Sequence, residues 1–408
     1  MSYSFEYANL YIEKYHNGKL LLDFTMEREF LYFAYNGDYN DNMRLEQYEP
    51  TMLYFYNVEN LHLIEGDIIS VSMRQLIDYK EHAEKVYSDN IEESEAPYNV
   101  FMSFVNGIWL EELFNTGEAF KNNHLKRKLI ELLEGTWQHG SPCTLNKLSD
   151  EIDVEIVDVG QGSTNLIQSN GVLTIFDFGA SIFASKSKLK SIANEITHKS
   201  DNLYKTSLII SHWDCDHYNL LTVLDDNWLR RFCCVFFPAE VISLTSKQVV
   251  KRLFSNCKYI CTFKSPLVKV KGTAEIVPII SKSNYTLYIG KKSKSINKSG
   301  LALAVKSSND VTILGADHTN KQIWEGIYSH SIDKLAYNRL NVVVPHHGGK
   351  CGKINMSHIC INPGVAAISV GKNTYKHPNQ ATIDDYENLG FDIKRTDWER
   401  KNILIEMK

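Results

Sequence analysis

The stretch LIISHWDCDHYNLL, residues 208–221, decides the fold of this chain. It begins with the β-forming residues Leu208, Ile209 and Ile210, which predict a buried strand. Directly after them come four potential metal ligands within six residues, namely His212, Asp214, Asp216 and His217. Two imidazoles and two carboxylates held this close would bury unpaired charge unless a cation lay among them. The stretch therefore predicts a divalent-metal site at the end of a strand, with a solvated polar loop as the alternative.

Length and composition indicate an ordinary globular protein with more than one domain. The chain has 408 residues, of which 43% are hydrophobic and 23% are charged. A single core rarely grows beyond about 250–300 residues, so two domains are expected. No stretch approaches the roughly 20 apolar residues that span a bilayer, and the first residues do not resemble a signal peptide. We therefore expect a cytoplasmic protein with reduced cysteine thiols and no membrane partner.

Charge is distributed unevenly along the chain. Residues 1–150 contain 12 Lys and Arg against 25 Asp and Glu, a balance of −13. Residues 151–408 contain 32 against 24, a balance of +8. A basic half that also carries metal ligands suits an anionic substrate such as a phosphodiester, whereas an acidic half would repel one. A solvated lysine-rich surface is the alternative explanation of the basic balance.

The first part of the chain predicts a small α+β accessory domain. Alternating apolar runs at 20–24, 30–35, 52–58 and 67–73 indicate antiparallel strands, since they are separated by turn residues. From Arg74 the pattern becomes helical in RQLIDYKEHAEKVY, WLEELF and LKRKLIELLEG. The turn-rich segment 136–150 marks a boundary, so we expect an accessory domain over 1–145 and a second domain over 146–408. The negative charge of 1–145 favours binding of a protein partner over base stacking by its aromatic residues.

The second part alternates strands and helices. Residues 154–181, VEIVDVGQGSTNLIQSNGVLTIFDFGAS, predict three strands joined by glycine turns. KSKLKSIANEITHK then predicts a helix before the strand that leads into the metal cluster. The GQG turn begins like a dinucleotide-binding fingerprint, but a strand follows it instead of a helix, which argues against that kind of site.

Several segments occur in the order seen in the metallo-β-lactamase superfamily. They are DVGQGS (158–163), FDFG (176–179), SHWDCDH (211–217), NKSGLAL (297–303), ILGADH (313–318), VVPHHGG (343–349), AAISVGKNTYKHP (366–378) and LGFDIKRTD (389–397). Residues 151–408 resemble most the soluble C-terminal hydrolase domain of ComEC-type DNA-uptake proteins. This resemblance implies an α/β fold, a four-layer αββα sandwich with a two-metal site along one edge. Nothing in residues 1–150 resembles the membrane channel of those proteins, so a role in DNA uptake is not implied.

The resemblance also implies a ligand set for two divalent ions. The implied ligands are His212 and Asp214 for the first ion, Asp216 and His217 for the second, Asp317 as a bridge between them, and His346 to close the second site. His347 either shares the role of His346 or supports it. Asp177 matches a buried aspartate that orients a ligand imidazole. Asn297 and Ser299 either complete the first site, hold a water molecule or form a plain turn.

One departure from the family bears on the metal. Metallo-β-lactamases supply a further histidine between the HxHxDH motif and the bridging aspartate, but this chain has none between Tyr218 and Asp317. Asp214 also stands where the motif usually has histidine. Because oxygen ligands favour harder ions, the sequence favours manganese, with zinc as the alternative.

The expected chemistry is hydrolysis by a water that two cations activate together. Asp216 would act there with His377, which lies where the resemblance places a substrate-side histidine, and with Lys372, which can hold a phosphate oxygen. A basic track toward the site is expected at Lys291, Lys292, Lys294 and Lys298. We expect a metal-dependent phosphodiesterase, foremost a nuclease acting on DNA. The alternatives are a hydrolase of a small phosphodiester or ester (cyclic nucleotide, phospholipid head group or thioester) and a non-catalytic interaction protein.

Overall fold

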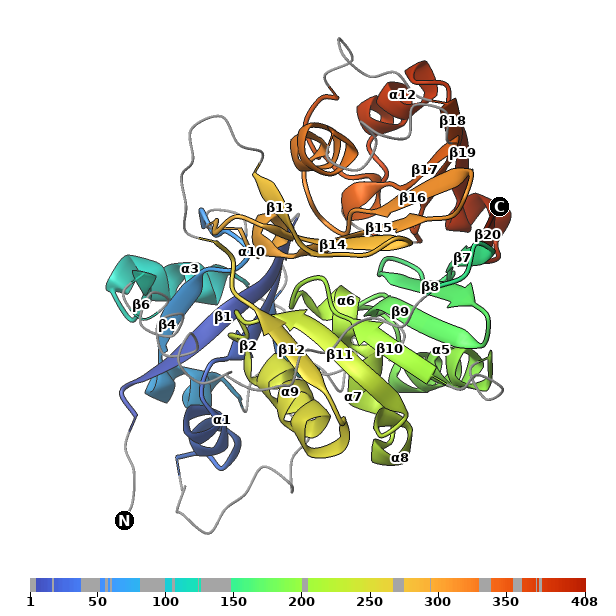
Figure 1. The fold of residues 1–408 in the computed structure, drawn as a ribbon. Helices are drawn as coiled ribbons and strands as arrows, with labels where there is room; N and C mark the ends of the chain where they lie inside the picture. The colour runs from blue at the N-terminus through green and yellow to red at the C-terminus, as the bar shows by residue number, and fades with distance from the viewer. Residues whose placement is uncertain are drawn as a thin grey trace. The chain divides into compact units, whose positions relative to one another are not determined.

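The computed structural model describes most of the chain (Figure 1). The described residues are 5–16, 18–37, 52–55, 58, 61–80, 100–104, 107–123, 125, 148–199, 205–266, 275–293, 295–329, 339–354, 362–371, 373 and 376–408. Lys294, Lys372, the acidic run 91–97 and the expected helix at 125–135 lie outside this set, apart from residue 125. In the described residues, no helix combines the length and the apolar character that crossing a membrane requires.

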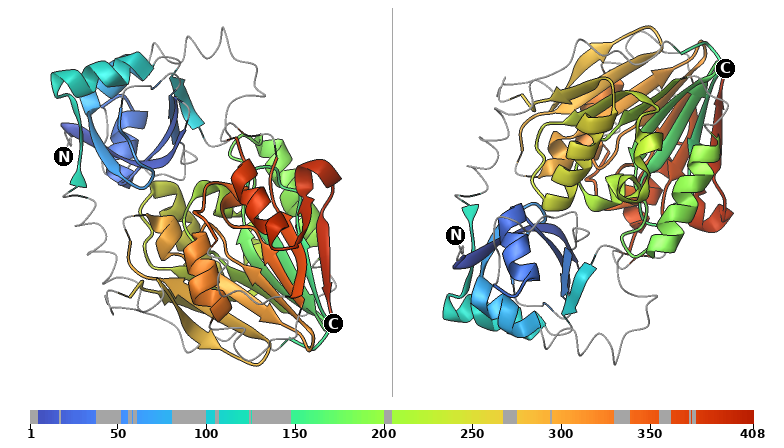
Figure 2. Two further views of the ribbon diagram at one scale, coloured as in Figure 1. Left: turned by 90° about the horizontal axis from the view of Figure 1, so that it is seen from above. Right: turned by 90° about the horizontal axis from the view of Figure 1, so that it is seen from below.

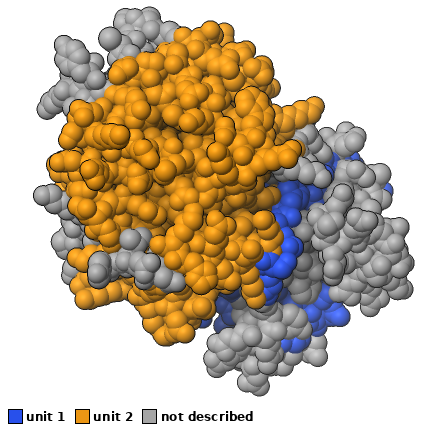
Figure 3. All heavy atoms as spheres, turned by 90° about the vertical axis from the view of Figure 1, so that its right-hand side faces the viewer, with its two compact units in different colours: residues 1–136, 183–187, 240–251 blue, residues 137–182, 188–239, 252–408 orange. Residues whose placement is uncertain are grey.

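The chain divides into two compact units, which Figure 3 colours separately. Unit 1 comprises residues 1–136, 183–187 and 240–251, and unit 2 comprises 137–182, 188–239 and 252–408. The two short segments 183–187 and 240–251 lie more than 40 residues beyond residue 136 in the sequence, so the division does not fall at one point of the chain. The boundary expected near residue 145 stays a prediction.

Unit 1 is built on a six-stranded sheet with the order β5-β3-β2-β1-β4-β6. Its strands are β1 (Tyr7–His16), β2 (Lys19–Phe24), β3 (Met52–Phe55), β4 (Ile68–Ser72), β5 (Val100–Phe104) and β6 (Ala119–Lys121). Its helices are α1 (Glu27–Ala34) and α3 (Gly107–Thr116), and residues 73–80 are also helical. The core gathers apolar residues from the strands and helices, together with Leu244 from the segment 240–251.

Two expectations for this region are wrong. The run at 30–35 forms α1 instead of a strand, because Phe30, Leu31, Phe33 and Ala34 bury one face of a helix. In addition, β3 pairs with β5 in parallel, so the sheet is not purely antiparallel. The expected helix at WLEELF is confirmed as α3.

Unit 2 contains two seven-stranded sheets. The first has the order β12-β11-β10-β9-β8-β7-β20. Its strands are β7 (Ile152–Ile156), β8 (Thr164–Ser169), β9 (Val172–Phe178), β10 (Lys205–Ile209), β11 (Phe232–Pro238), β12 (Ile260–Phe263) and β20 (Ile403–Met407). Strands β9 to β12 run parallel, as their intervening helices require, whereas β7, β8 and β20 are antiparallel to their neighbours.

The second sheet of unit 2 has the order β13-β14-β15-β16-β17-β18-β19. Its strands are β13 (Ile276–Ser281), β14 (Tyr285–Gly290), β15 (Leu301–Lys306), β16 (Asp310–Leu314), β17 (Arg339–Val343), β18 (Asn362–Ile368) and β19 (Asp392–Arg395). The strands from β16 to β19 are parallel, so their carboxyl ends lie at one edge of the sheet.

The two sheets of unit 2 pack face to face. Their shared core contains Ile167 and Phe176 from the first sheet with Leu287 and Leu303 from the second. On the outer face of the second sheet, a second core joins strand residues to the π-type helix η2 (Gln322–Tyr328) and to α12 (Gln380–Asn388). Helix α5 (Lys186–Lys199) follows β9, and Figure 2 shows it on the outer face of the first sheet. Helix α9 (Leu244–Asn256) follows β11, and its Phe254 contacts Phe237 of that strand edge-on. The expected four-layer αββα sandwich is thus confirmed.

The remaining short helices of unit 2 connect strands. They are α6 (Cys215–Tyr218), α7 (Leu220–Val223), α8 (Asp226–Leu229), α10 (Ile296–Ser299), the 3-10 turn η3 (Pro345–Gly348) and α13 (Thr396–Glu399). The expectation of reduced thiols is wrong at Cys234, which is disulfide-bonded. It is confirmed at five other cysteines, which have reduced thiols: Cys215, Cys233, Cys257, Cys261 and Cys351.

Candidate metal centre

The expected ligands follow the carboxyl ends of parallel strands from both sheets. His212 and Asp214 come directly after β10, and α6 then carries Asp216 and His217. The other three follow the second sheet, Asp317 after β16 and the pair His346 and His347 after β17. Because parallel strands end at a common edge, the fold gathers side chains that are more than 100 residues apart in sequence.

A glycine allows the metal motif to pack closely against its neighbouring strand. A Cβ atom at Gly179, just beyond β9, would lie 2.1 Å from the carbonyl oxygen of Asp216. Only glycine fits there, so FDFG contributes a close approach between β9 and α6 as well as the carboxylate of Asp177.

Three buried histidines share one tautomer. Asp177 Oδ2 accepts hydrogen bonds from His217 Nδ1 at 2.8 Å and from the Ser211 hydroxyl at 2.9 Å. That hydroxyl in turn accepts from His212 Nδ1 at 2.8 Å, and the carbonyl oxygen of Ser369 accepts from His347 Nδ1 at 3.0 Å. With the proton on Nδ1, each Nε2 atom presents a lone pair. All three Nε2 atoms are buried with no hydrogen-bond partner among the described residues.

These nitrogen atoms face carboxylate oxygens. Asp317 Oδ1 lies 3.3 Å from His217 Nε2, and Asp317 Oδ2 lies 3.8 Å from His212 Nε2. His212 Nε2 is also 3.4 Å from Asp214 Oδ2. One carboxylate therefore turns its two oxygens toward two different imidazoles, which is the arrangement expected of a bridging ligand.

The potential ligand atoms form two overlapping groups. His212, His217 and Asp317 make the first and Asp216, His217 and His347 the second, each with ligand atoms within 4.8 Å of one another. His347 lies in the second group, with Nε2 3.6 Å from Asp216 Oδ2. His346 instead donates from Nδ1 to Asp317 Oδ2 at 2.6 Å. The geometry therefore favours His347 for the closing position that the resemblance assigned to His346.

The electrostatics of the cluster favour added positive charge. Burial alone would lower the pKa of His217, but the carboxylates of Asp317 and Asp177 raise this pKa well above its usual value. Burial would likewise raise the pKa of Asp317, but His346 and His217 hold it well below its usual range. The same field that attracts a proton to His217 would attract a divalent cation.

Backbone strain is concentrated at this edge. Asp177, His346 and His347 have φ angles of 61°, 51° and 52°, in the left-handed region that non-glycine residues rarely adopt. The two consecutive histidines turn their rings to different partners because of this conformation. Strain of this kind, about 1–3 kcal/mol for each residue, persists where the surrounding structure enforces it and is common at functional sites.

The other expected site residues lie at different distances from the cluster. Asn297 Nδ2 donates to Asp317 Oδ2 at 3.3 Å, so it borders the cluster. Ser299 instead accepts from the backbone N–H of Ser293 at 2.9 Å and holds a local turn. The ring centroid of His377 lies 5.3 Å from that of His346. Lys372 lies outside the described residues.

Sequence reasoning missed three residues around the cluster. Ser211 links Asp177 to His212, as described above. His318 is fully buried beside the bridge position, where burial lowers its pKa to about 4 and its Nδ1 donates to the carbonyl oxygen of Gly315. Gln161 lies beside His377. Each of the three lies within one of the segments SHWDCDH, ILGADH and DVGQGS, which is the signal that could have found them.

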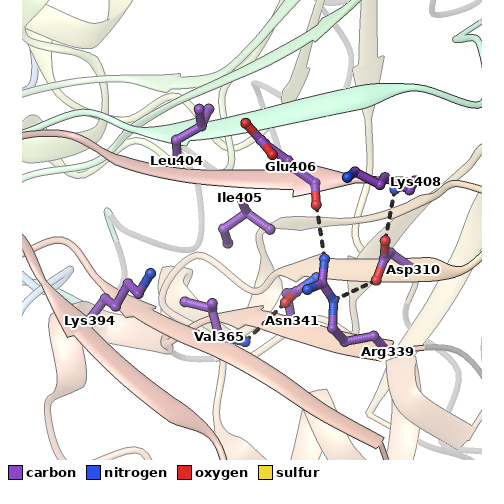
Figure 4. Close-up of a pocket in the computed structure, with 9 residues that line it drawn as sticks. All are labelled: Asp310, Arg339, Asn341, Val365, Lys394, Leu404, Ile405, Glu406 and Lys408. Atoms are coloured by element: carbon purple, nitrogen blue, oxygen red, sulfur yellow. Dashed lines mark hydrogen bonds and ion pairs between the residues drawn. The ribbon is translucent and has the colours of Figure 1, made fainter.

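One cavity of the described residues lies away from the cluster. It has a volume of about 420 Å³ and is lined by residues that include Asp310 and Arg339, the first residues of β16 and β17 (Figure 4). The metal cluster follows the opposite ends of these strands. Arg339 already pairs with Asp310 at 2.7 Å and donates to the carbonyl oxygen of Glu406 at 2.9 Å. We therefore take the cluster, and not this cavity, as the functional site.

Comparisons with known proteins concern the fold. No protein-family model matches the chain, and no curated protein matches it. Among solved structures, the metallo-beta-lactamase fold protein YhfI from Bacillus subtilis is 11% identical, with 62% of this chain and 99% of that chain covered and a TM-score of 0.37. Tm1679, described as a metal-dependent hydrolase of the beta-lactamase superfamily, is 11% identical, with 62% and 98% covered and a TM-score of 0.35.

A third structure is AidC, described as a dizinc quorum-quenching lactonase. It is 13% identical, with 45% of this chain and 78% of that chain covered and a TM-score of 0.25. The fold itself is decided by the strand orders and the layers described above. By these criteria, unit 2 has an α/β, four-layer αββα fold, which is the fold that the resemblance of its segments implied.

Proposed function

We propose that unit 2 is a metal-dependent hydrolase that cleaves phosphodiester bonds, with DNA as its substrate. The observation that carries this proposal is the pair of overlapping ligand groups that share His217. Two cations held side by side by these groups would stabilise both the attacking and the leaving oxygen of a displacement at phosphorus, as in phosphatases and nucleases.

The residues fit two divalent ions. Three imidazole lone pairs and the carboxylates of Asp214, Asp216 and Asp317 converge on one buried region, which matches the ligands that manganese and zinc accept. When bound, the ions would supply Lewis acidity to a water and to the attacked phosphoryl group. Manganese is our first candidate because the carboxylates outnumber those of a typical zinc site.

The chain's own residues have separate tasks in this proposal. Asp177, through His217 and Ser211, holds two imidazoles in the tautomer that a ligand needs. Asn297 fixes the orientation of Asp317. His377 is partly exposed, so it is available to a substrate oxygen, whereas His212, His217 and His347 are buried. Lys372 remains our candidate for binding a phosphate oxygen.

The charge distribution supports a polyanion as substrate. Residues 151–408 carry a balance of +8, and Lys291, Lys292 and Lys298 lie next to Asn297 in sequence. If such lysines bind phosphates, DNA binding depends on salt, and the slope of that dependence decreases by about 1 for each lysine–phosphate pair that a substitution removes. Residues 1–145 carry the opposite charge and are proposed to bind a protein partner.

The test compares long and small substrates. Manganese-loaded protein should cleave single- or double-stranded DNA and also a chromogenic phosphodiester. The variant Lys291→Glu/Lys292→Glu should weaken DNA cleavage and flatten its salt dependence while leaving the small substrate unaffected. The matched control is Lys188→Glu/Lys190→Glu, which reverses two exposed charges on α5.

Three outcomes would contradict the proposal in different ways. Cleavage of the small phosphodiester alone would replace DNA by a small phosphodiester. Turnover of lactones or thioesters alone would move the reaction to ester hydrolysis. No turnover by protein that holds two ions would indicate a non-catalytic role.

A further inference from the structure

Gln161 is a buried polar residue whose side chain is turned toward one partner. It is 3% exposed and lies in the Gly160–Gly162 turn. Its Nε2 atom lies 3.4 Å from His377 Nδ1, and its Oε1 atom has no hydrogen-bond partner among the described residues. Burying an amide with so little local bonding is unfavourable, so a simple turn-filling role does not explain this glutamine.

The turn that carries Gln161 packs directly against the loop that carries His377. A Cβ atom at Gly371 would lie 2.5 Å from Gly160 Cα. The His377 backbone is fixed from the other side, because Asn373 accepts from its N–H and donates to its carbonyl oxygen, both at 3.0 Å. Asn373 therefore fixes the backbone of His377, while Gln161 contacts its ring.

The opposite edge of the His377 ring faces the metal cluster. A Cβ atom at Gly349 would lie 2.8 Å from His377 Nε2 and 2.5 Å from His346 Cδ2, so the two rings converge over this glycine. His346 in turn donates to Asp317. His346 and His377 are also the partly exposed imidazoles of this edge, so a substrate would meet them first.

We propose that Gln161 is a positioning residue, which donates from Nε2–H to His377 Nδ1 and thereby fixes the His377 proton on Nε2. His377 then donates a hydrogen bond from Nε2–H to an oxygen of the substrate beside the cluster. An oriented donor of this kind stabilises charge that develops on that oxygen. The inference rests on the proposed function for the identity of the substrate, but the contact between the two side chains stands without it.

A double-mutant cycle tests whether Gln161 acts through His377. With the chromogenic phosphodiester, Gln161→Ala should lower kcat by about 10- to 100-fold with little change in KM, because a misplaced catalytic group slows the reaction step. In a His377→Ala background the same substitution should have no further effect. Gln168→Ala, the same change in β8, is the matched control, and melting temperature and bound metal should stay constant throughout.

A spectroscopic experiment tests the contact without any turnover. In metal-free protein with ¹⁵N-labelled histidine, the ring of His377 should carry its proton on Nε2, and the bare Nδ1 should be visible in ¹⁵N–¹H correlation spectra. The Gln161→Glu variant offers only acceptor atoms, so it should move that proton to Nδ1. Gln161→Ala should leave a mixture of the two tautomers.

The outcomes separate this inference from the proposed function. If the protein cleaves phosphodiesters but Gln161→Ala lowers kcat equally with and without His377, the inference is overturned. A His377 ring that carries its proton on Nδ1 in the unsubstituted protein would also overturn it. If no phosphodiester is cleaved while the predicted tautomer and its shift in Gln161→Glu are observed, the positioning contact holds and only the function fails.

Discussion

Both units bury carboxylates, but they treat the charge in opposite ways. In unit 1, burial raises the pKa of Asp23 to about 6 and also raises the pKa of Glu29. The cation near them, Lys247, has its pKa lowered by burial to about 8. In unit 2, neighbouring imidazoles hold the pKa of Asp317 well below its usual range. A buried acid in unit 1 is thus easily neutralised, whereas Asp317 keeps its charge.

This difference shows why burial of an aspartate or glutamate does not by itself indicate a metal-binding site. Glu29 is satisfied by two hydrogen bonds from Asn9, and Asp23 accepts from the backbone N–H of Thr245 at the start of α9. These contacts connect strands and a helix of one core. The cluster in unit 2 differs because buried imidazole nitrogen atoms lie opposite charged oxygens, an arrangement that a proton or a divalent cation between them stabilises.

The sharpest test replaces one aspartate in each unit by asparagine. Unsubstituted protein should hold close to two divalent ions per chain after reconstitution. Asp317→Asn should lose both ions and all hydrolytic activity, because Asp317 faces His212 and also His217, the residue that the two ligand groups share. Asp23→Asn, the matched control, should keep both ions. Elemental analysis of gel-filtered protein measures this, and two retained ions in Asp317→Asn would disprove the bridging assignment.

A smaller effect is expected at the residue that orients the ligands. Asp177→Asn can still accept one hydrogen bond, but it no longer fixes both the tautomer of His217 and the direction of the Ser211 hydroxyl. Metal affinity should fall about 10- to 100-fold, as is typical when such a supporting carboxylate is removed. Competition with a fluorescent chelator gives the affinity. An unchanged affinity would mean that Asp177 only satisfies hydrogen-bond donors inside the core, as Glu29 does, and does not orient metal ligands.

Metal identity should change activity by a smaller factor still. At equal occupancy, manganese should restore several-fold more activity to chelated protein than zinc, because Asp214 replaces a nitrogen ligand. Higher activity with zinc would mean that the imidazole nitrogen atoms, and not the carboxylates, determine the metal preference of the cluster. His318 would then be the residue to examine, since its Nε2 is buried without a hydrogen-bond partner among the described residues.

The smallest effect concerns the pH dependence of stability in unit 1. The pKa of Asp23 is about 6 in the folded chain, against an ordinary value of 3.8. The folded state therefore binds this proton more tightly, and stability falls as pH rises from about 4 to about 6. Asp23→Asn should flatten this slope and stabilise the protein above pH 6 by on the order of 2 kcal/mol.

Urea unfolding at pH 4.5, 5.5 and 7 measures this effect. Asp78→Asn, a change at an exposed acid of the same unit, should leave the slope as it is. A slope that persists in Asp23→Asn would assign the pH dependence to Glu29 instead.

The layers of unit 2 were expected from the resemblance of several segments to one superfamily, whereas the position of His212–His217 at a strand end followed from a local pattern. The strand β10 and the ligands behind it are contiguous, so HxDxDH needs no tertiary information. The roles of His346 and His347 depend on a left-handed backbone that no pattern encodes. The partnership of Gln161 with His377 joins residues 216 positions apart, and the segment 240–251 joins unit 1 only through folding.

The pairing of β20 with β7 has a consequence for how this protein is made. Ile403 lies opposite Ile156, so the first sheet gains its edge strand from residues that follow β7 by more than half of the 408 residues. At a synthesis rate of about 5–20 residues per second, β20 is therefore made at least about ten seconds after β7. Until then one edge of the layer that holds β10 is unpaired, so nascent chains that stall before residue 403 should be prone to aggregation.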